Sequence, residues 1–118
     1  SDTSLKMITR RIETEDPCCL GLEQQDGELC AFILRYEDGS LGMLHVEEAY
    51  RRSGYGTRLL VEATRLLEER GEPRVAYIVD GNGASQGLFA KQGWIREDPN
   101  AKKGTGKRRA KRKWIKSE

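Results

Sequence analysis

The first feature of chemical interest is a short loop, Arg51-Arg52-Ser53-Gly54-Tyr55-Gly56, which joins a strand-like segment to a strongly helical one. Backbone N–H groups at the start of a helix point outward, and the aligned peptide dipoles give that end a partial positive charge. Glycines let a ligand approach the backbone, and arginines add charge-assisted hydrogen bonds to phosphate. The loop is therefore predicted to bind an anion, and an ordinary glycine-rich helix start with solvated arginines is the alternative.

Three known anion-binding patterns can be compared with this loop. A Walker loop needs Gly-Lys-Ser/Thr after four residues, which the chain lacks. A dinucleotide fingerprint needs a third glycine where Leu59 stands, although Asp80 lies at a tolerable distance for an acid that binds ribose. The third pattern, Arg/Gln-x-x-Gly-x-Gly/Ala, is matched at every fixed position by Arg51, Gly54 and Gly56.

A second segment, Asn82 to Trp94, follows at a separation that leaves room for one helix and one strand. The two segments together resemble the signatures of the GNAT superfamily of N-acyltransferases, the second of which reads Asn-x-x-Ala/Ser-x-x-Leu-Tyr/Phe-x-Lys-x-Gly-Phe. The matching residues are Asn82, Ser85, Leu88, Lys91 and Gly93, with aromatic substitutes at Phe89 and Trp94. The stretch from Cys18 to Trp94 is also similar to the carboxy-terminal half of the glycine N-acyltransferase-like family.

This resemblance implies an acyl-CoA-dependent N-acyltransferase, in which the amine of a small molecule or amino acid attacks the thioester directly. In the superfamily two parallel strands splay apart, and the pantetheine arm of coenzyme A enters between them. Backbone groups of Leu44, His45 and Val46 would contact that arm and stabilise the tetrahedral oxyanion. The other cofactor-binding residues that the resemblance implies are Arg51, Arg52, Ser53, Gly54, Tyr55, Gly56, Thr57, Asn82, Ser85 and Phe89; no metal is expected.

The proton-transfer groups are less well defined. Many relatives have a tyrosine at the position of Phe89 to protonate the departing thiolate, and phenylalanine cannot donate a proton. The candidate general bases are His45, Glu47 and Glu48, since histidine accepts protons near neutral pH. A structural histidine, solvated loop carboxylates and a chain of water molecules are the alternatives. Asn82 would serve either as a helix N-cap alone or as a cap that also contacts coenzyme A.

The elements that must position these residues follow from hydrophobic spacing. Two Asp-Gly turns join three apolar runs into an antiparallel meander, because glycine accepts the positive φ of hairpin turns. From Thr57 the apolar residues recur at helical spacing until Gly71 and Pro73. The predicted strands are 20–24, 29–36, 41–46, 74–79, 94–97 and 111–116, with a shorter helix over 82–93 and a helical turn around 5–12. Strand 74–79 reads as buried on both faces.

A helix of about sixteen residues between two strands suits a right-handed crossover, so strands 41–46 and 75–79 should be parallel. The expected fold is α/β (α+β), the GNAT fold: a mixed, mostly antiparallel sheet with a central parallel β-α-β unit and flanking helices. The superfamily usually begins with a strand and two helices, which residues 1–17 cannot hold. We therefore expect the chain to be part of a longer protein, or a partner such as a second copy to supply the missing wall.

Composition indicates one domain over residues 1–118, with a poorly defined start at 1–16 and no apolar run near the roughly 18 residues of a membrane helix. Cys18, Cys19 and Cys30 lack metal-ligand spacing and lie in apolar surroundings. Buried thiols and the lack of a signal-peptide pattern favour an intracellular location, cytoplasmic or mitochondrial.

Basic charge is concentrated near the C-terminus. Residues 102–116 hold nine of the 21 Lys and Arg, which leaves 12 basic residues against 18 acidic ones in residues 1–101. A basic loop is expected over 98–110. The basic stretch 102–113, which overlaps it, is expected to be mobile and suits three roles: a solvated hairpin loop, attraction of phosphates or acidic substrates, or nucleic-acid binding. Two alternative functions therefore stand beside the small-molecule enzyme, namely a protein N-acetyltransferase and a catalytically degenerate CoA- or nucleic-acid-binding module.

Overall fold

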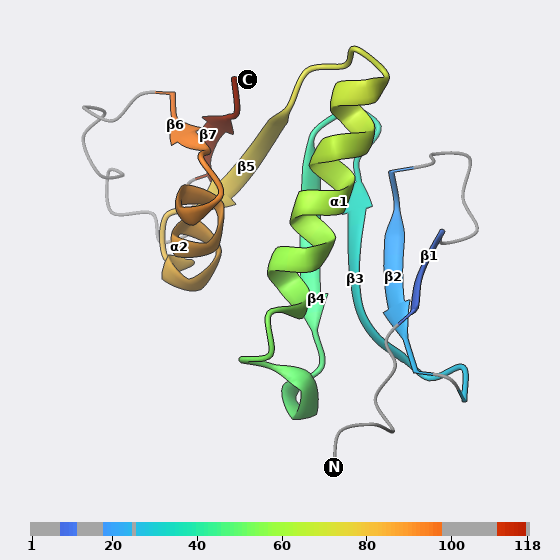
Figure 1. Cartoon of the computed structure of the whole chain (residues 1–118). Coiled ribbons are helices and arrows are strands. Elements are labelled where there is room, and N and C mark those ends of the chain that lie inside the picture. The colour runs from blue at the N-terminus through green and yellow to red at the C-terminus, as the bar shows by residue number, and fades with distance from the viewer. Residues whose placement is uncertain (1–7, 12–17, 25, 98–110, 118) are drawn as a thin grey trace.

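The computed structural model describes residues 8–11, 18–24, 26–97 and 111–117 (Figure 1). Two helices and one 3-10 turn accompany seven strands in these residues. The elements in chain order are β1 (Ile8–Arg11), β2 (Leu20–Glu23), β3 (Leu29–Arg35), β4 (Leu41–Val46), η2 (Glu48–Tyr50), α1 (Tyr55–Glu69), β5 (Val75–Val79), α2 (Gly83–Lys91), β6 (Ile95–Arg96) and β7 (Lys111–Ile115). The basic loop predicted over 98–110 lies outside the described residues.

All the described strands belong to one mixed sheet, in the order β1-β2-β3-β4-β5-β7-β6. Strands β1 to β4 form an antiparallel meander, β4 pairs with β5 in parallel, and β7 lies antiparallel between β5 and β6. The predicted meander and the parallel β4-α1-β5 unit are therefore confirmed. Figure 1 shows β4 and β5 diverging as they run away from the end that they share.

The two Asp-Gly hairpins form as predicted. Gly27 and Gly39 have φ values of 91° and 92°, which residues with a side chain rarely adopt. In the second hairpin the Asp38 carboxylate accepts hydrogen bonds from the Ser40 hydroxyl at 2.6 Å and the Ser40 N–H at 2.8 Å. These bonds, the hydroxyl first, hold the pKa of Asp38 below its usual range.

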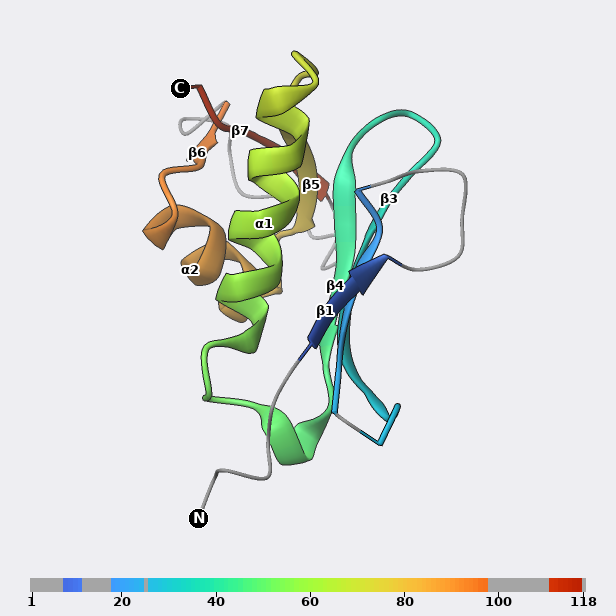
Figure 2. The same cartoon turned by 45° about the vertical axis from the view of Figure 1, so that its right-hand side comes forward.

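Helix α1 covers one face of the meander through a single apolar stripe (Figure 2). Leu59, Leu60, Ala63 and Leu67 are completely buried, and the helix contacts β2, β3 and β4. Burial of one leucine side chain is worth roughly 1.5–3 kcal/mol, so this stripe fixes the helix against the sheet. The helix begins at Tyr55, two residues earlier than predicted, and this places its first turn at the end of β4.

Two of the sequence-based expectations are wrong. The helical turn expected around residues 5–12 is a strand over Ile8–Arg11, while residues 5–7 and 12 lie outside the described part. This short segment pairs with β2 from Ile8↔Glu23 to Arg11↔Leu20, and such pairing depends on residues remote in sequence. Strand β5 is buried on one face only, because Ala76 and Ile78 point into the core while Tyr77 is 42% exposed.

The core holds all three cysteines, as predicted: Cys18, Cys19 and Cys30 are buried, and none of them forms a disulfide bond in the described part of the chain. Trp94 is buried and packs edge-on against Phe89, with 5.0 Å between ring centroids, whereas Lys91 is exposed. Neither described helix combines the length and apolar character that a membrane span requires.

Candidate functional site

The parallel strands β4 and β5 are paired only where they begin. A single register pair, Leu41↔Ala76, joins them. Beyond it, β4 carries a bulge, since Phe32 pairs with His45 and Leu34 with Gly42, so that two residues of β4 oppose one of β3. Met43 lies in this bulge with φ 47°, a conformation uncommon for a residue with a side chain. A bulge bends its strand, which accounts for the separation of β4 from β5.

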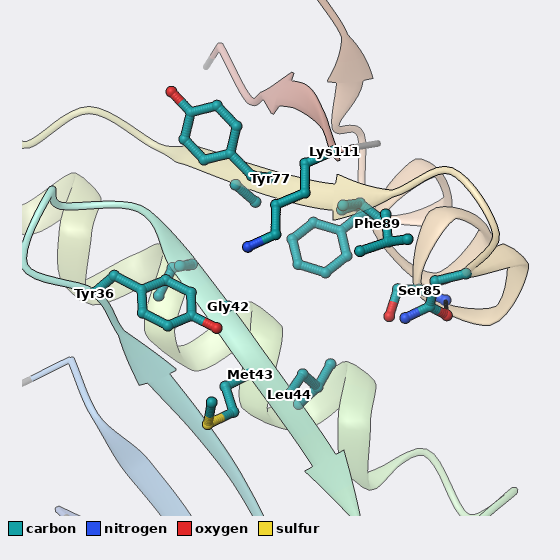
Figure 3. Close-up of a pocket in the computed structure, with 13 residues that line it drawn as sticks. Tyr36, Gly42, Met43, Leu44, Tyr77, Ser85, Phe89 and Lys111 are labelled. Atoms are coloured by element: carbon teal, nitrogen blue, oxygen red, sulfur yellow. Dashed lines mark hydrogen bonds between the residues drawn. The ribbon is translucent and has the colours of Figure 1, made fainter. Parts of the chain in front are cut away.

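A cleft of about 210 Å³ occupies the space between the separated strands (Figure 3). Its walls come from β4, β5, the first turns of α2 and the start of β7. The lining residues are Tyr36, Leu41, Gly42, Met43, Leu44, Ala76, Tyr77, Ile78, Val79, Asn82, Ser85, Phe89 and Lys111. Four residues predicted to bind a cofactor, namely Leu44, Asn82, Ser85 and Phe89, are thus brought together from segments far apart in the chain.

The start of α1 lacks a side-chain cap. Its N-cap residue is Gly54, with φ 80° and ψ 8°, and the Gly54 carbonyl accepts the first intrahelical bond from the Arg58 N–H at 3.0 Å. The N–H groups of Tyr55, Gly56 and Thr57 precede that bond and have no partner within the helix. By contrast, the Asn82 side chain caps α2 by accepting from the Ser85 N–H at 3.1 Å, as predicted. An uncapped helix start is suited to an anionic ligand.

Gly56 connects this helix start to the cleft. A Cβ added at Gly56 would lie 3.5 Å from Leu88 Cδ2, 3.6 Å from Val46 Cγ2 and 3.8 Å from Leu44 Cδ2. These are ordinary contact distances, and a Cβ at this position would face other side chains of the protein and not a ligand. Gly56 therefore offers its N–H to an anion, but close approach to the backbone does not require a glycine here. Gly54 differs, because nothing lies within 4 Å of a Cβ at that position.

The arginines of the loop have different roles. Arg51 Nε donates to the Val46 carbonyl at 2.9 Å and so ties the loop to the end of β4. Arg52 adopts φ 64° and is exposed, as is Ser53, whose hydroxyl reaches the Arg51 carbonyl at 3.5 Å. The predicted cationic, glycine-containing surface is thus present at the start of α1.

The turn before the loop is anchored by Tyr50 in η2. The Tyr50 hydroxyl is hydrogen-bonded to Gln24, and the side chain packs against the core. Burial, together with a hydrogen bond to Cys30, raises the pKa of Tyr50 to about 12. Tyr50 therefore holds the loop over residues 51–56 to the sheet as a neutral phenol.

The three candidate bases lie outside the cleft. His45 Nε2 is 3.2 Å from Glu47 Oε1, and the His45 ring lies 5.4 Å from the ring of Phe32. The His45 and Glu47 side chains are 41% and 57% exposed, and Glu48 is exposed in η2. None of the three lines the cleft in the described part of the chain. The role of a general base therefore stays a prediction for them.

Sequence reasoning missed Tyr36, Tyr77 and Lys111 at the mouth of the cleft. These residues also line a wider cavity of about 630 Å³, together with Glu37, Asp38 and Ser40. Tyr77 alternates along β5 with Ala76 and Ile78, which face the core, so the wider cavity opens on the sheet face away from α1. An aromatic residue within the apolar run of β5 was the only signal that the sequence offered.

Known proteins provide an independent comparison. A family described as FR47-like protein matches residues 19–101. No curated protein matches the chain.

Solved structures of GNAT acetyltransferases share the fold. A protein provisionally described as a phosphinothricin N-acetyltransferase is 25% identical, with a TM-score of 0.62 over 85% of this chain and 72% of that one. The ribosomal-protein-S18-alanine N-acetyltransferase of Escherichia coli is 24% identical, with a TM-score of 0.65 over 85% and 70%. The PaiA N-acetyltransferase of Thermoplasma acidophilum, solved with coenzyme A, is 21% identical, with a TM-score of 0.65 over 85% and 60%. The predicted fold is therefore confirmed.

Proposed function

The chain belongs to the FR47-like protein family, and on that premise we propose that it transfers an acyl group from an acyl-coenzyme A thioester to an amine. The observation that carries the proposal is the separation of β4 from β5 beyond Leu41↔Ala76, next to the uncapped start of α1. A cleft between strands suits the narrow pantetheine arm, and free N–H groups at a helix start suit its diphosphate. Both features occur on adjoining surfaces.

In this proposal each part of the site has a distinct task. The N–H groups of Tyr55, Gly56 and Thr57 bind the diphosphate, with Arg52 adding positive charge. Asn82, Ser85 and Phe89 form the α2 wall beside the arm. A backbone N–H near Leu44 donates to the oxyanion, since a bulge leaves one residue outside the regular ladder. The amine attacks the thioester carbon directly, and binding geometry supplies a large part of the rate.

We propose that the acceptor is a small amine or an amino acid, and that it enters through the wider cavity. We choose this acceptor class because the motifs within residues 18–94 resemble those of the glycine N-acyltransferase-like family. The cavity lies on the sheet face away from α1 and shares Tyr36, Tyr77 and Lys111 with the cleft. An amine in it would therefore reach a thioester held between β4 and β5.

A protein N-acetyltransferase is the second candidate. The wider cavity is open, and the carboxylates of Glu37 and Asp38 line it, which would favour a cationic peptide. The E. coli protein of this fold is described as acting on the alanine of a ribosomal protein, which makes a peptide acceptor worth testing.

Three measurements test the proposal. Calorimetry with coenzyme A should show saturable binding to the whole chain. Release of free thiol from acetyl-CoA should then depend on an added amine, and mass spectrometry should find the N-acylated product among a panel of amino acids, simple amines and peptides. Product from peptides alone would select the second candidate. Binding with no thiol release for any acceptor would make the chain a CoA-binding module and refute the enzyme.

A further inference from the structure

A thioester held in the cleft would require a proton donor for its leaving group. A departing thiolate has to be stabilised and protonated, and Phe89 has no acidic proton. Among the described residues that line the cleft, Tyr36, Tyr77, Asn82, Ser85 and Lys111 carry donor groups. Lys111 alone in this set is positively charged. Figure 3 shows its amine extending past Phe89 into the space between β4 and β5.

The backbone of β7 holds Lys111 at this place. Lys111 pairs with Val79, the last residue of β5, so it lies near the end where β4 and β5 are separated. Trp114 of the same strand is buried, and Arg112 Nε is 3.1 Å from each carboxylate oxygen of Asp80. These contacts fix the strand from which the Lys111 side chain extends.

Lys111 differs from the two basic residues that follow it. Arg112 is paired with Asp80, and Lys113 Nζ lies 3.3 Å from Glu97 Oε2. Lys111 takes part in none of the ion pairs formed among the described residues. Its charge contributes to the lowered pKa of Asp38, but that carboxylate is already hydrogen-bonded by Ser40. The Lys111 ammonium group is therefore left to act on a ligand in the cleft.

We propose that Lys111 is the acid of the transfer reaction, stabilising the coenzyme A thiolate and protonating it; this rests on the proposed function. The amine nitrogen forms a bond to the thioester carbon, and the C–S bond breaks with its electron pair on sulfur. Lys111 Nζ gives one proton to that sulfur. The proton lost by the amine nitrogen passes to water, and exposed Lys111 takes a proton back from water. An ammonium group suits this task because it combines three donors with a positive charge.

The test compares Lys111→Met and Lys111→Gln with Lys113→Met, a matched variant of a lysine on the same strand that does not line the cleft. Loss of general acid catalysis typically costs about 10²–10⁴-fold. We expect kcat to fall about 100-fold or more in both Lys111 variants, while calorimetric affinity for coenzyme A changes less than about 5-fold, a limit near 1 kcal/mol. Lys113→Met should keep the wild-type kcat.

A rescue variant and a change of acceptor separate this role from simple substrate binding. Adding Phe89→Tyr to Lys111→Met should restore at least about 10-fold of the lost kcat, because a phenol then lines the same cleft. The fall in kcat of Lys111→Met should be equal for acceptor amines with and without a carboxylate. A rise in amine KM at unchanged kcat would make Lys111 an anchor for the acceptor and overturn the proposal, as would equal kcat in Lys111→Met and Lys113→Met. Absence of thiol release by the wild type would instead overturn the proposed function itself.

Discussion

Replacement of Gly54 by alanine is the most direct test of the proposal that the loop over residues 51–56 binds an anion. A residue with a side chain costs roughly 1–2 kcal/mol in the left-handed conformation that Gly54 adopts at φ 80°. No clash adds to this cost, since nothing lies within 4 Å of a Cβ there. Alanine also lowers the conformational entropy of the unfolded chain, which stabilises the fold and offsets about 0.4–1 kcal/mol of that cost. The net loss of stability should therefore be about 1 kcal/mol.

For a chain of 118 residues this loss corresponds to a fall in Tm of roughly 4 °C, from the average unfolding entropy per residue. Coenzyme A binding should weaken by about 5- to 30-fold, equivalent to 1–2 kcal/mol, because a loop that relaxes to negative φ misdirects the N–H groups of Tyr55, Gly56 and Thr57. Calorimetry gives the affinity and thermal unfolding gives the stability.

Gly56→Ala is the matched control. Its Cβ meets Leu88, Val46 and Leu44 at 3.5–3.8 Å, and alanine favours the helix, so stability and affinity should remain at or slightly above the wild-type values. Gly54→Asn should fall between the two, because asparagine visits the left-handed region more readily than alanine. Unchanged coenzyme A affinity in Gly54→Ala would refute the account of the loop. A greater loss of coenzyme A affinity in Gly56→Ala than in Gly54→Ala would also refute it.

Further outcomes are expected elsewhere in the molecule. Leu60→Ala removes a completely buried side chain from α1 and should lower the free energy of unfolding by about 2–5 kcal/mol in urea titrations, with no change in the slope. Asn82→Ala should cost about 1 kcal/mol through the lost cap on the Ser85 N–H, and Asn82→Asp should retain it. Ser40→Ala should raise the pKa of Asp38 toward its usual value. A lowered carboxyl pKa stabilises the fold at pH values above the unfolded-state pKa, and this contribution disappears as the pH falls through the folded-state pKa. The difference in unfolding free energy between wild type and Ser40→Ala should therefore shrink on acidification. A difference that stays constant with pH would contradict this.

Features encoded by neighbouring residues could be predicted. The Asp-Gly turns require positive φ at Gly27 and Gly39, and the apolar residues of α1 recur at helical spacing, so that they form one stripe that packs against the sheet. The spacing of Arg51, Gly54 and Gly56 predicted a glycine loop at a helix start, which the structure confirms, while the binding of an anion there stays a prediction. The cap by Asn82 was predictable for the same reason, since it depends on four consecutive residues.

Features that depend on sheet pairing could not be predicted. The segment Ile8–Arg11 becomes a strand because β2 supplies its hydrogen-bonding partner. Tyr77 is exposed because the helices cover the other face of the sheet. The bulge at Met43 depends on the register between β3 and β4. None of these leaves a periodic pattern in the residues concerned.

The sequence by itself determined a mixed α/β fold, with a cationic glycine loop placed at the start of an amphipathic helix. Only the tertiary structure decided where β4 and β5 separate, just after Leu41↔Ala76, and that Lys111 enters the resulting cleft from a third strand. The physical reason is that local spacing governs turns and helix faces, whereas a cleft between strands is built from residues that the sheet register brings together from across the chain.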